Sequence, residues 1–255
     1  MSLTFVGLGL FDEKDISLKG LERAKEADVI FAEFYTSKLF GAKKEDFEEL
    51  FERELRVLSR EEVEQQQKPL ELAHENDVVF LVPGDPMIST THTDLRIKAM
   101  ENAIETQIIH ASSIFTAAPG LSGLQNYKFG RSATVTFLSR GEVAESPYNA
   151  IKQNKENGLH TLLFLDINEE KNRYMAPNRA LELLLKIEEG RQEEVIGREN
   201  LAVVVSRAGS DDVEVKVGEV NDLLEFEFGE PLHSLIIPGE LHFREEEALR
   251  AIRKG

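Results

Sequence analysis

The apolar residues of the chain occur in short runs that are separated by polar stretches of helical periodicity. Val78–Val82 contains no polar residue, a pattern typical of a strand buried on both faces in a parallel sheet. Leu3–Val6 and Val29–Ala32 are largely apolar and predict two more strands. Between these two runs, Ser17 can cap a helix whose apolar side chains share one face, namely Leu18, Leu21, Ala24 and Ala27.

Strands and helices continue to alternate up to residue 112. Ser59 and Glu62 have the spacing of a capping box, which predicts the start of a polar helix. Further strands are predicted at Leu55–Leu58 and Gln107–His110. Two apolar stripes predict the other helices: Phe47, Leu50 and Phe51, and then Leu95, Ala99, Met100 and Ala103. This alternation predicts a parallel sheet.

Residues 113–255 have a different pattern. Val213–Val217 alternates strictly between apolar and polar residues, which predicts an antiparallel hairpin strand with one face in water. Pro177 is typical of a first helical position, and the inward residues that follow are Ala180, Leu181, Leu184 and Ile187. Other strands are predicted at Thr134–Phe137, Thr161–Leu165, Leu201–Val205 and Ser234–Ile237. The sequence therefore predicts two α/β domains, residues 1–112 with a mainly parallel sheet and residues 113–255 with a mixed one.

A stiff turn follows the most apolar strand. Pro83 cannot donate to a sheet ladder, and Gly84 allows backbone angles that other residues avoid, so Pro83–Pro86 ends the strand abruptly. The carboxyl edge of an open α/β sheet is where ligands bind, and this turn presents the carboxylate of Asp85 there. Glu33–Ser37 and Ala111–Phe115 follow other strands and belong to the same edge. A surface turn without any ligand is the alternative.

The first strand ends in a glycine-containing loop, Gly7–Leu10, which resembles the start of a dinucleotide-binding fingerprint. The third glycine of that fingerprint is replaced by Asp12, and Asp12–Asp15 places three acidic side chains where a pyrophosphate would lie. These carboxylates would repel it. A dehydrogenase with an NAD site is therefore the weakest candidate.

Composition narrows the class of function further. The net charge of −17 argues against nucleic acid as a partner, because phosphate contacts need a basic surface. The chain has no Cys, its six His residues lack metal-ligand spacing, and we expect no metal. Its apolar runs are too short to span a membrane, and no basic leader precedes the first strand. The expected location is the cytoplasm.

Several motifs together resemble those of the archaeal diphthine synthases, a family within the tetrapyrrole-methylase superfamily. The Gly-Asp-Pro turn marks the superfamily, whereas Glu33–Ser37 and Thr90–His92 point to the family. The other matching segments are Phe5–Leu10, Tyr127–Gly130, Leu159–Asp166 and Arg207–Gly209. The resemblance implies a fold of two α/β domains of the tetrapyrrole-methylase type, with the cofactor cleft between them.

The resemblance also implies an activity. Members of the family are homodimeric S-adenosylmethionine-dependent methyltransferases, which convert the donor to S-adenosylhomocysteine. They repeatedly methylate the amino group of the amino-carboxypropyl-modified histidine of elongation factor 2, which gives diphthine in diphthamide biosynthesis. The implied cofactor contacts fall on Leu10, Asp85, Ile88, Ser113, Ile114, Leu165, Ala208 and His233. The catalytic residues are unknown, since methyl transfer from a sulfonium needs placement more than acid–base groups.

Each of these residues also has a plain structural interpretation. Asp85 can cap its own turn, and Leu10 and Leu165 can be ordinary core residues. His92 is tempting as a base, but a histidine at the start of a helix more often bonds to backbone. The aromatic side chains of Phe34, Tyr35 and Tyr127 can face a quaternary ammonium group or simply pack at the domain junction.

Three other functions compete with this one. The nearest is an enzyme of the same fold that methylates a tetrapyrrole or corrin precursor, although such carboxylate-rich acceptors would favour a basic cleft. The others are a non-catalytic cofactor-binding module and an α/β interaction protein without any pocket. A test of cofactor binding distinguishes the interaction protein, which would not bind the cofactor, from the enzymes and the binding module, which would.

Overall fold

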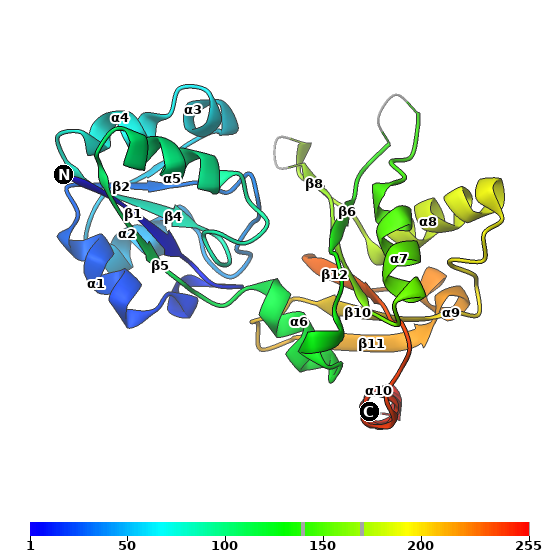
Figure 1. Ribbon diagram of the computed structural model, residues 1–255. Helices are drawn as coiled ribbons and strands as arrows, with labels where there is room; N and C mark the ends of the chain where they lie inside the picture. Colours follow the sequence, from blue (N-terminus) through cyan, green and yellow to red (C-terminus); the bar gives the residue numbers. More distant parts are fainter. Residues whose placement is uncertain (139–140, 169–170, 255) are drawn as a thin grey trace. The chain divides into compact units, whose positions relative to one another are not determined.

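The computed structural model describes residues 1–138, 141–168 and 171–254. The chain forms two compact units, Met1–Ile114 and Phe115–Gly255, each with its own sheet (Figure 1).

The first unit contains a sheet of five parallel strands in the order β3-β2-β4-β1-β5. The strands are β1 (Ser2–Gly7), β2 (Val29–Ala32), β3 (Leu55–Val57), β4 (Asp77–Val82) and β5 (Glu105–Ile109). The helices that connect them are α1 (Leu18–Glu26), α2 (Lys44–Phe51), α3 (Arg60–Glu64), α4 (Lys68–Ala73) and α5 (His92–Glu101). The parallel sheet and the strand at Val78–Val82 are therefore confirmed.

Strand β4 explains why its run has no polar residue. Val79 and Leu81 pack on the face covered by α1 and α2, next to Phe47 and Phe51. Val78, Phe80 and Val82 point to the opposite face, where they join side chains of α3, α4 and α5 in a second cluster. Figure 1 shows α1 and α2 on one side of this sheet and α4 and α5 on the other. Both faces exclude water, so polar groups are confined to the strand ends.

Local helix signals are confirmed where the side chain bonds to backbone. The Ser17 hydroxyl accepts a hydrogen bond from the Gly20 N–H, and Ser59 with Glu62 forms the expected capping box. The predicted apolar helix faces, however, included residues that are exposed or lie beyond the helix end. Leu18 is 79% exposed in the first turn of α1, and Met100 is 50% exposed at the end of α5. Ala103 lies beyond α5 with a positive φ, so the predicted stripe runs past the true helix end.

The second unit has a mixed sheet in the order β11-β10-β12-β7-β6, in which only β6 and β7 are parallel neighbours. Its strands are β6 (Ala133–Val135), β7 (Thr161–Leu165), β10 (Leu201–Ser206), β11 (Glu214–Glu219) and β12 (His233–Ile237), and β8 (Ile167–Asn168) pairs with β9 (Arg173–Tyr174). Its helices are α6 (Ile114–Ser122), α7 (Ser146–Glu156), α8 (Pro177–Arg191), α9 (Val220–Leu224) and α10 (Phe243–Lys254). The predicted β10–β11 hairpin and the mixed sheet are confirmed.

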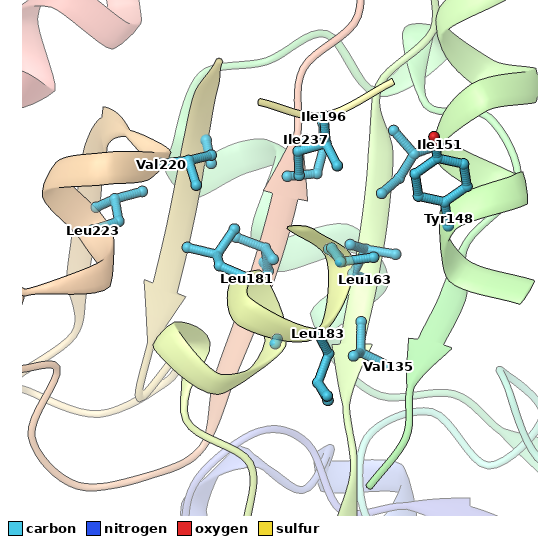
Figure 2. Packing of buried hydrophobic residues seen from close by; sticks show 14 of the residues in the cluster. Val135, Tyr148, Ile151, Leu163, Leu181, Leu183, Ile196, Val220, Leu223 and Ile237 are labelled. Carbon is cyan, nitrogen blue, oxygen red and sulfur yellow. The ribbon is translucent and has the colours of Figure 1, made fainter. Parts of the chain in front are cut away.

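The core of the second unit lies between one face of this sheet and the helices α7, α8 and α9 (Figure 2). Leu181 and Leu184 of α8 are fully buried, as the sequence pattern predicted, and so is Tyr148 of α7. Burial of a large apolar side chain contributes about 1.5–3 kcal/mol, so this cluster is a main source of stability.

A buried ionic cluster attaches α10 to the rest of the second unit. The Glu245 carboxylate accepts hydrogen bonds from His160 Nε2 (2.9 Å) and Lys128 Nζ (2.7 Å) and from the backbone N–H groups of Gln125 and His242 (both 2.8 Å). Burial opposes ionisation, but these bonds outweigh it and lower the pKa of Glu245 to about 2. His160 Nδ1 accepts from the Gly239 N–H, so its Nε2 carries the proton.

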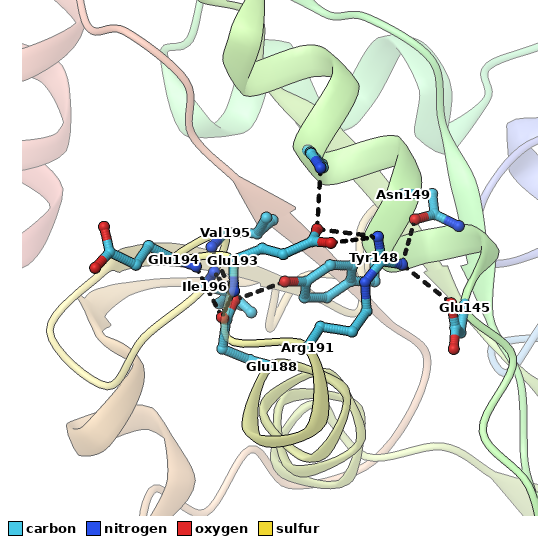
Figure 3. A network of polar contacts seen from close by, with 10 residues as sticks. Glu145, Tyr148, Asn149, Glu188, Arg191, Glu193, Glu194, Val195 and Ile196 are labelled. Atoms are coloured by element: carbon cyan, nitrogen blue, oxygen red, sulfur yellow. Dashed lines mark hydrogen bonds and ion pairs between the residues drawn. The ribbon is translucent and has the colours of Figure 1, made fainter.

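A second carboxylate, Glu188, closes the loop that follows α8 (Figure 3). One of its oxygens accepts from the N–H groups of Glu193 and Glu194, and the other from those of Val195 and Ile196, all within 3.0 Å. The Tyr148 hydroxyl adds a further bond of 2.8 Å. Although burial opposes ionisation, these donors lower the pKa of Glu188 to about 2.

Glu188→Gln should destabilise the protein by about 2 kcal/mol, because an amide NH₂ would replace one acceptor oxygen and oppose backbone N–H donors. Denaturant unfolding of both proteins measures the difference. The contribution of Glu188 is present above the ordinary glutamate pKa of 4.5 and is lost as the pH falls toward about 2. The difference between the two proteins should therefore shrink below about pH 4. Glu189→Gln, on an exposed residue of the same helix, is the control and should have little effect.

Candidate functional site

The carboxyl edge of the first sheet brings together loops from different parts of the chain. Leu8–Leu10 follows β1, which ends at Gly7, and Pro83–Pro86 follows β4, its direct neighbour. His110–Ser113 follows β5 on the other side of β1. Because the strands are parallel, all three loops leave the sheet at the same edge.

The loops after β1 and β4 are joined by backbone hydrogen bonds. The Gly84 N–H donates to the Gly9 carbonyl at 2.7 Å, and the Gly9 N–H donates back to the Gly84 carbonyl at 3.3 Å. Gly9 and Gly84 both have a positive φ, which suits glycine. A Cβ at Gly7 would lie 2.5 Å from the Gly84 carbonyl oxygen and 2.7 Å from the Ala111 Cβ. Glycine at position 7 therefore allows the three loops to approach closely.

The glycine loop has no free amides for a phosphate at its tip. The N–H groups of Leu10 and Phe11 both donate to one carboxylate oxygen of Asp15, at 3.1 and 2.7 Å. Asp15 thus occupies the place that an anionic ligand would take in a dinucleotide-binding loop. This arrangement gives the expected exclusion of pyrophosphate a direct structural cause.

Asp85 is buried, with 8% exposure, and both of its oxygens have partners. One accepts from the Met87 N–H at 3.0 Å, which is the turn-capping bond, and the other lies 2.7 Å from His110 Nδ1. The His110 side chain is 71% exposed, so solvent or a ligand can reach the far side of this pair. Ile88, three positions further along the same turn, is 44% exposed and presents an apolar side chain.

The remaining candidates of the first unit lie after β5. Ser113 is buried, and Ile114 begins α6 and is half-buried. Leu10 is also half-buried, at the loop after the neighbouring strand β1. The structure therefore places Leu10, Asp85, Ile88 and Ser113 in the loops of one sheet edge, and Ile114 at the start of the helix that follows.

The candidates of the second unit share an edge of the second sheet. Leu165 ends β7, Ala208 follows the end of β10, and His233 begins β12. Strand β12 is antiparallel to both neighbours, so its first residue lies beside their last ones, as the pairings Ser206 with His233 and Phe164 with Ser234 show. Leu165 and Ala208 are half-buried.

His233 is held in place by its neighbours. Its Nδ1 lies 2.8 Å from the Ser206 hydroxyl, and its side chain is buried. Burial lowers the pKa of His233 to about 4, and the nearby charge of Arg207 acts in the same direction. The imidazole is therefore neutral at neutral pH, which suits a hydrogen-bonding role.

Arg207 shapes the backbone beside Ala208. It has a φ of +53°, unusual for a residue with a side chain. Its guanidinium donates to the carbonyl groups of Phe228 and Asp212 and forms an ion pair with the Asp212 carboxylate. These bonds fix the loop on which Ala208 lies.

Sequence reasoning missed four supporting residues: Asp15, Glu33, His110 and Arg207. It quoted Glu33 and Arg207 only as parts of motifs, and it treated Asp15 as a repulsive charge. For Glu33, His110 and Arg207 the available signal was an ionisable residue placed directly after a strand, whereas Asp15 lies in the loop region after β1 and gave no such signal. The interpretation of His92 is confirmed, because it begins α5 and its Nδ1 lies 3.4 Å from the Pro86 carbonyl oxygen. Tyr127 is 73% exposed, and both interpretations of its side chain stay predictions.

In the described ranges, none of the helices is long and apolar enough to cross a membrane.

The family model of the Tetrapyrrole (Corrin/Porphyrin) Methylases matches residues 2–224. The chain is 54% identical to the diphthine synthase of Methanocella arvoryzae, over 97% of this chain and 96% of that protein. It is 47% identical to the diphthine synthase of Methanocaldococcus jannaschii, over 97% of each. A crystal structure of a diphthine synthase superposes with a TM-score of 0.91 at 42% identity, covering 100% of this chain and 96% of the other.

The close approach at Gly7 generates a prediction. Gly7→Ala should destabilise the protein by roughly 1–3 kcal/mol, because the added methyl group displaces the Gly84 carbonyl and Ala111. Thermal unfolding measures the loss. Gly190→Ala in α8 is the matched control, since a Cβ there meets nothing within 4 Å. Equal unfolding midpoints for Gly7→Ala and the unchanged protein would show that the three loops are not packed as described.

Proposed function

The chain belongs to the tetrapyrrole methylase family and, within it, to the diphthine synthases, and we propose that it uses S-adenosylmethionine to methylate elongation factor 2. It is a methyltransferase. The acceptor in this proposal is the amino group of the amino-carboxypropyl-modified histidine of the factor. Its repeated methylation yields the trimethylammonium group of diphthine.

One observation carries the choice of cofactor. The amides at the tip of the glycine loop are already bound by Asp15, so this loop suits a nucleoside cofactor that lacks phosphate groups. S-adenosylmethionine is such a cofactor, whereas NAD carries a pyrophosphate. The buried carboxylate of Asp85 nearby offers an acceptor for a ribose hydroxyl or for the methionine ammonium.

The proposed cofactor contacts come from both units. In the first unit they are Leu10, Asp85, Ile88, Ser113 and Ile114, and in the second unit they are Leu165, Ala208 and His233. Apolar side chains are the larger part of this set, which fits an adenine ring and a thioether. The neutral imidazole of His233 fits a hydrogen bond to an uncharged group.

The cofactor supplies an activated methyl group on a sulfonium centre, so the protein needs to orient the acceptor and exclude water. The acceptor amine attacks only when neutral. An α-amino group has a pKa of roughly 7.7–8, so a fraction is neutral near pH 7 without a dedicated base. The residues proposed here accordingly bind and orient, and none is assigned a catalytic proton transfer.

Because its relatives are diphthine synthases, we propose that the protein acts on elongation factor 2 as its substrate, assembles as a homodimer and is located in the cytoplasm. A tetrapyrrole or corrin precursor is the alternative acceptor, and the net charge of −17 disfavours such a polycarboxylate.

Calorimetric titration should show that the protein binds S-adenosylmethionine and S-adenosylhomocysteine but not NAD. Asp85→Ala should weaken binding of the first two by about 10- to 100-fold, because a charge-assisted hydrogen bond contributes about 1.5–3 kcal/mol. Asp94→Ala, which removes an exposed carboxylate of α5 that pairs with Lys98, is the control and should bind like the unchanged protein. Tight binding of NAD would contradict the proposed cofactor.

A labelled methyl group identifies the acceptor. Incubation with labelled cofactor and with elongation factor 2 that carries the amino-carboxypropyl group should label the factor. The unmodified factor should stay unlabelled. Label transfer to a porphyrin precursor instead would establish the alternative acceptor while leaving the cofactor assignment intact.

A further inference from the structure

Two buried ionisable side chains meet beside the candidate site of the first unit. Glu33 directly follows β2 and is 0% exposed, and His92 begins α5 and is 1% exposed. The Glu33 Oε1 atom lies 3.8 Å from His92 Nε2. In the described part of the chain, His92 Nε2 and the hydroxyl of Tyr35 are buried without any hydrogen-bond partner. Buried polar atoms of this kind are rare and call for an explanation.

Counting protons shows what this arrangement lacks. His92 lies between two acceptors, the Pro86 carbonyl at Nδ1 (3.4 Å) and the Glu33 carboxylate at Nε2. Each of these two nitrogen–oxygen contacts is favourable only if a proton lies between the two atoms, and a neutral imidazole carries only one N–H proton. When Glu33 is ionised, one ring nitrogen of the neutral imidazole therefore points its lone pair at the lone pair of an oxygen. One additional proton, on Glu33 or His92, removes this repulsion.

The surroundings favour placing this proton on Glu33. Burial raises the pKa of Glu33 to about 7, against the opposing effect of hydrogen bonds from Thr36 and the Tyr35 N–H and of the positive charge of Arg60. Burial lowers the pKa of His92 to about 4, although Glu64 and the Pro86 carbonyl act in the other direction. Tyr35 stays neutral, because burial together with Glu33 and Glu64 raises its pKa.

The pair joins two segments that lie at the edge of the sheet. Glu33 holds the Tyr35 and Thr36 N–H groups at 3.0 Å and so fixes the loop after β2. Through its bond to the Pro86 carbonyl, His92 holds the turn that carries Asp85 and Ile88. The His92 ring also packs edge-on against Phe80 of β4, at 5.0 Å between centroids.

We propose that Glu33 and His92 form a positioning pair in which one shared buried proton fixes the Pro83–His92 turn for cofactor binding. The proposal rests on the proposed function, since it assigns Asp85 and Ile88 to the cofactor. Neither residue of the pair contacts the cofactor in this role. Both act through the turn.

The two members of the pair should respond to substitution in opposite directions. Glu33→Gln keeps a carbonyl that accepts from the Tyr35 and Thr36 N–H groups and adds an NH₂ group that can donate to His92 Nε2, so it mimics the protonated glutamic acid. His92→Asn keeps a donor for the Pro86 carbonyl but removes the acceptor that faces Glu33. If Glu33 and His92 only packed against their neighbours, both variants would lose affinity for the cofactor.

Calorimetric titration with S-adenosylmethionine from about pH 5.5 to about pH 8.5 tests the proposal. In the unchanged protein the Kd should rise about 5- to 10-fold as the pH increases through about 7, as the shared proton is lost. Glu33→Gln should bind tightly across the range, and His92→Asn weakly across the range. Glu101→Gln, an exposed carboxylate at the far end of α5, is the matched control and should retain the pH profile of the unchanged protein.

Protein without ligand gives a second readout. A raised pKa means that the stability contributed by protonated Glu33 is complete below the ordinary value of 4.5 and is lost as the pH rises through about 7. The margin by which the unfolding midpoint of Glu33→Gln exceeds that of the unchanged protein should therefore grow between about pH 4.5 and about pH 7 and stay constant at higher pH. This readout remains available if His92→Asn fails to fold.

The outcomes separate the two proposals. Parallel pH profiles of Kd for the unchanged protein and Glu33→Gln would overturn the positioning pair while leaving the cofactor assignment intact. An absence of S-adenosylmethionine binding at every pH would overturn the proposed function and with it the positioning role. In that case the ligand-free unfolding series would still show whether Glu33 holds the buried proton.

Discussion

The first unit depends on a parallel sheet that is covered on both faces. Strand β4 contributes Val79 and Leu81 to one apolar cluster and Val78, Phe80 and Val82 to the other. A polar side chain within such a strand would lose its water without gaining partners. The polar groups of β4 and its turn therefore lie at the strand ends, where loops supply hydrogen bonds. The candidate site lies at this edge because the sheet leaves few other places for it.

The same constraint explains how much the sequence reveals. A continuous apolar run followed by Pro83–Pro86 predicts both a buried strand and a functional turn, and both signals are local. The packing of Gly7 against Gly84 and the filling of the glycine loop by Asp15 depend on segments brought together by folding. The sequence indicated that the acidic side chains after Gly9 would repel a pyrophosphate. It did not indicate that one of them, Asp15, would bind the N–H groups of the loop itself. The helix stripe through Met100 and Ala103 failed because an apolar residue near a helix end can face water.

The second unit reaches a comparable edge by a different route. Its strands β10 and β7 end where the antiparallel β12 begins, so residues far apart in the sequence become neighbours. Periodicity predicts these strands but not their order, and the order decides that Leu165, Ala208 and His233 share an edge. Arg207 then fixes the adjacent loop through backbone carbonyl groups, a role that its residue type alone does not disclose.

Protonation links the chemistry of the proposed reaction to the pair Glu33 and His92. The acceptor amine becomes more reactive as the pH rises, because its neutral fraction grows toward a pKa of roughly 8. The buried pair has the opposite requirement, since its shared proton is lost above about pH 7. The reactivity of the acceptor amine is thus favoured above pH 7, whereas the geometry of the turn is favoured below it. An enzyme built in this way would work best where the two ranges overlap, and its optimum would reflect cofactor placement as much as amine ionisation.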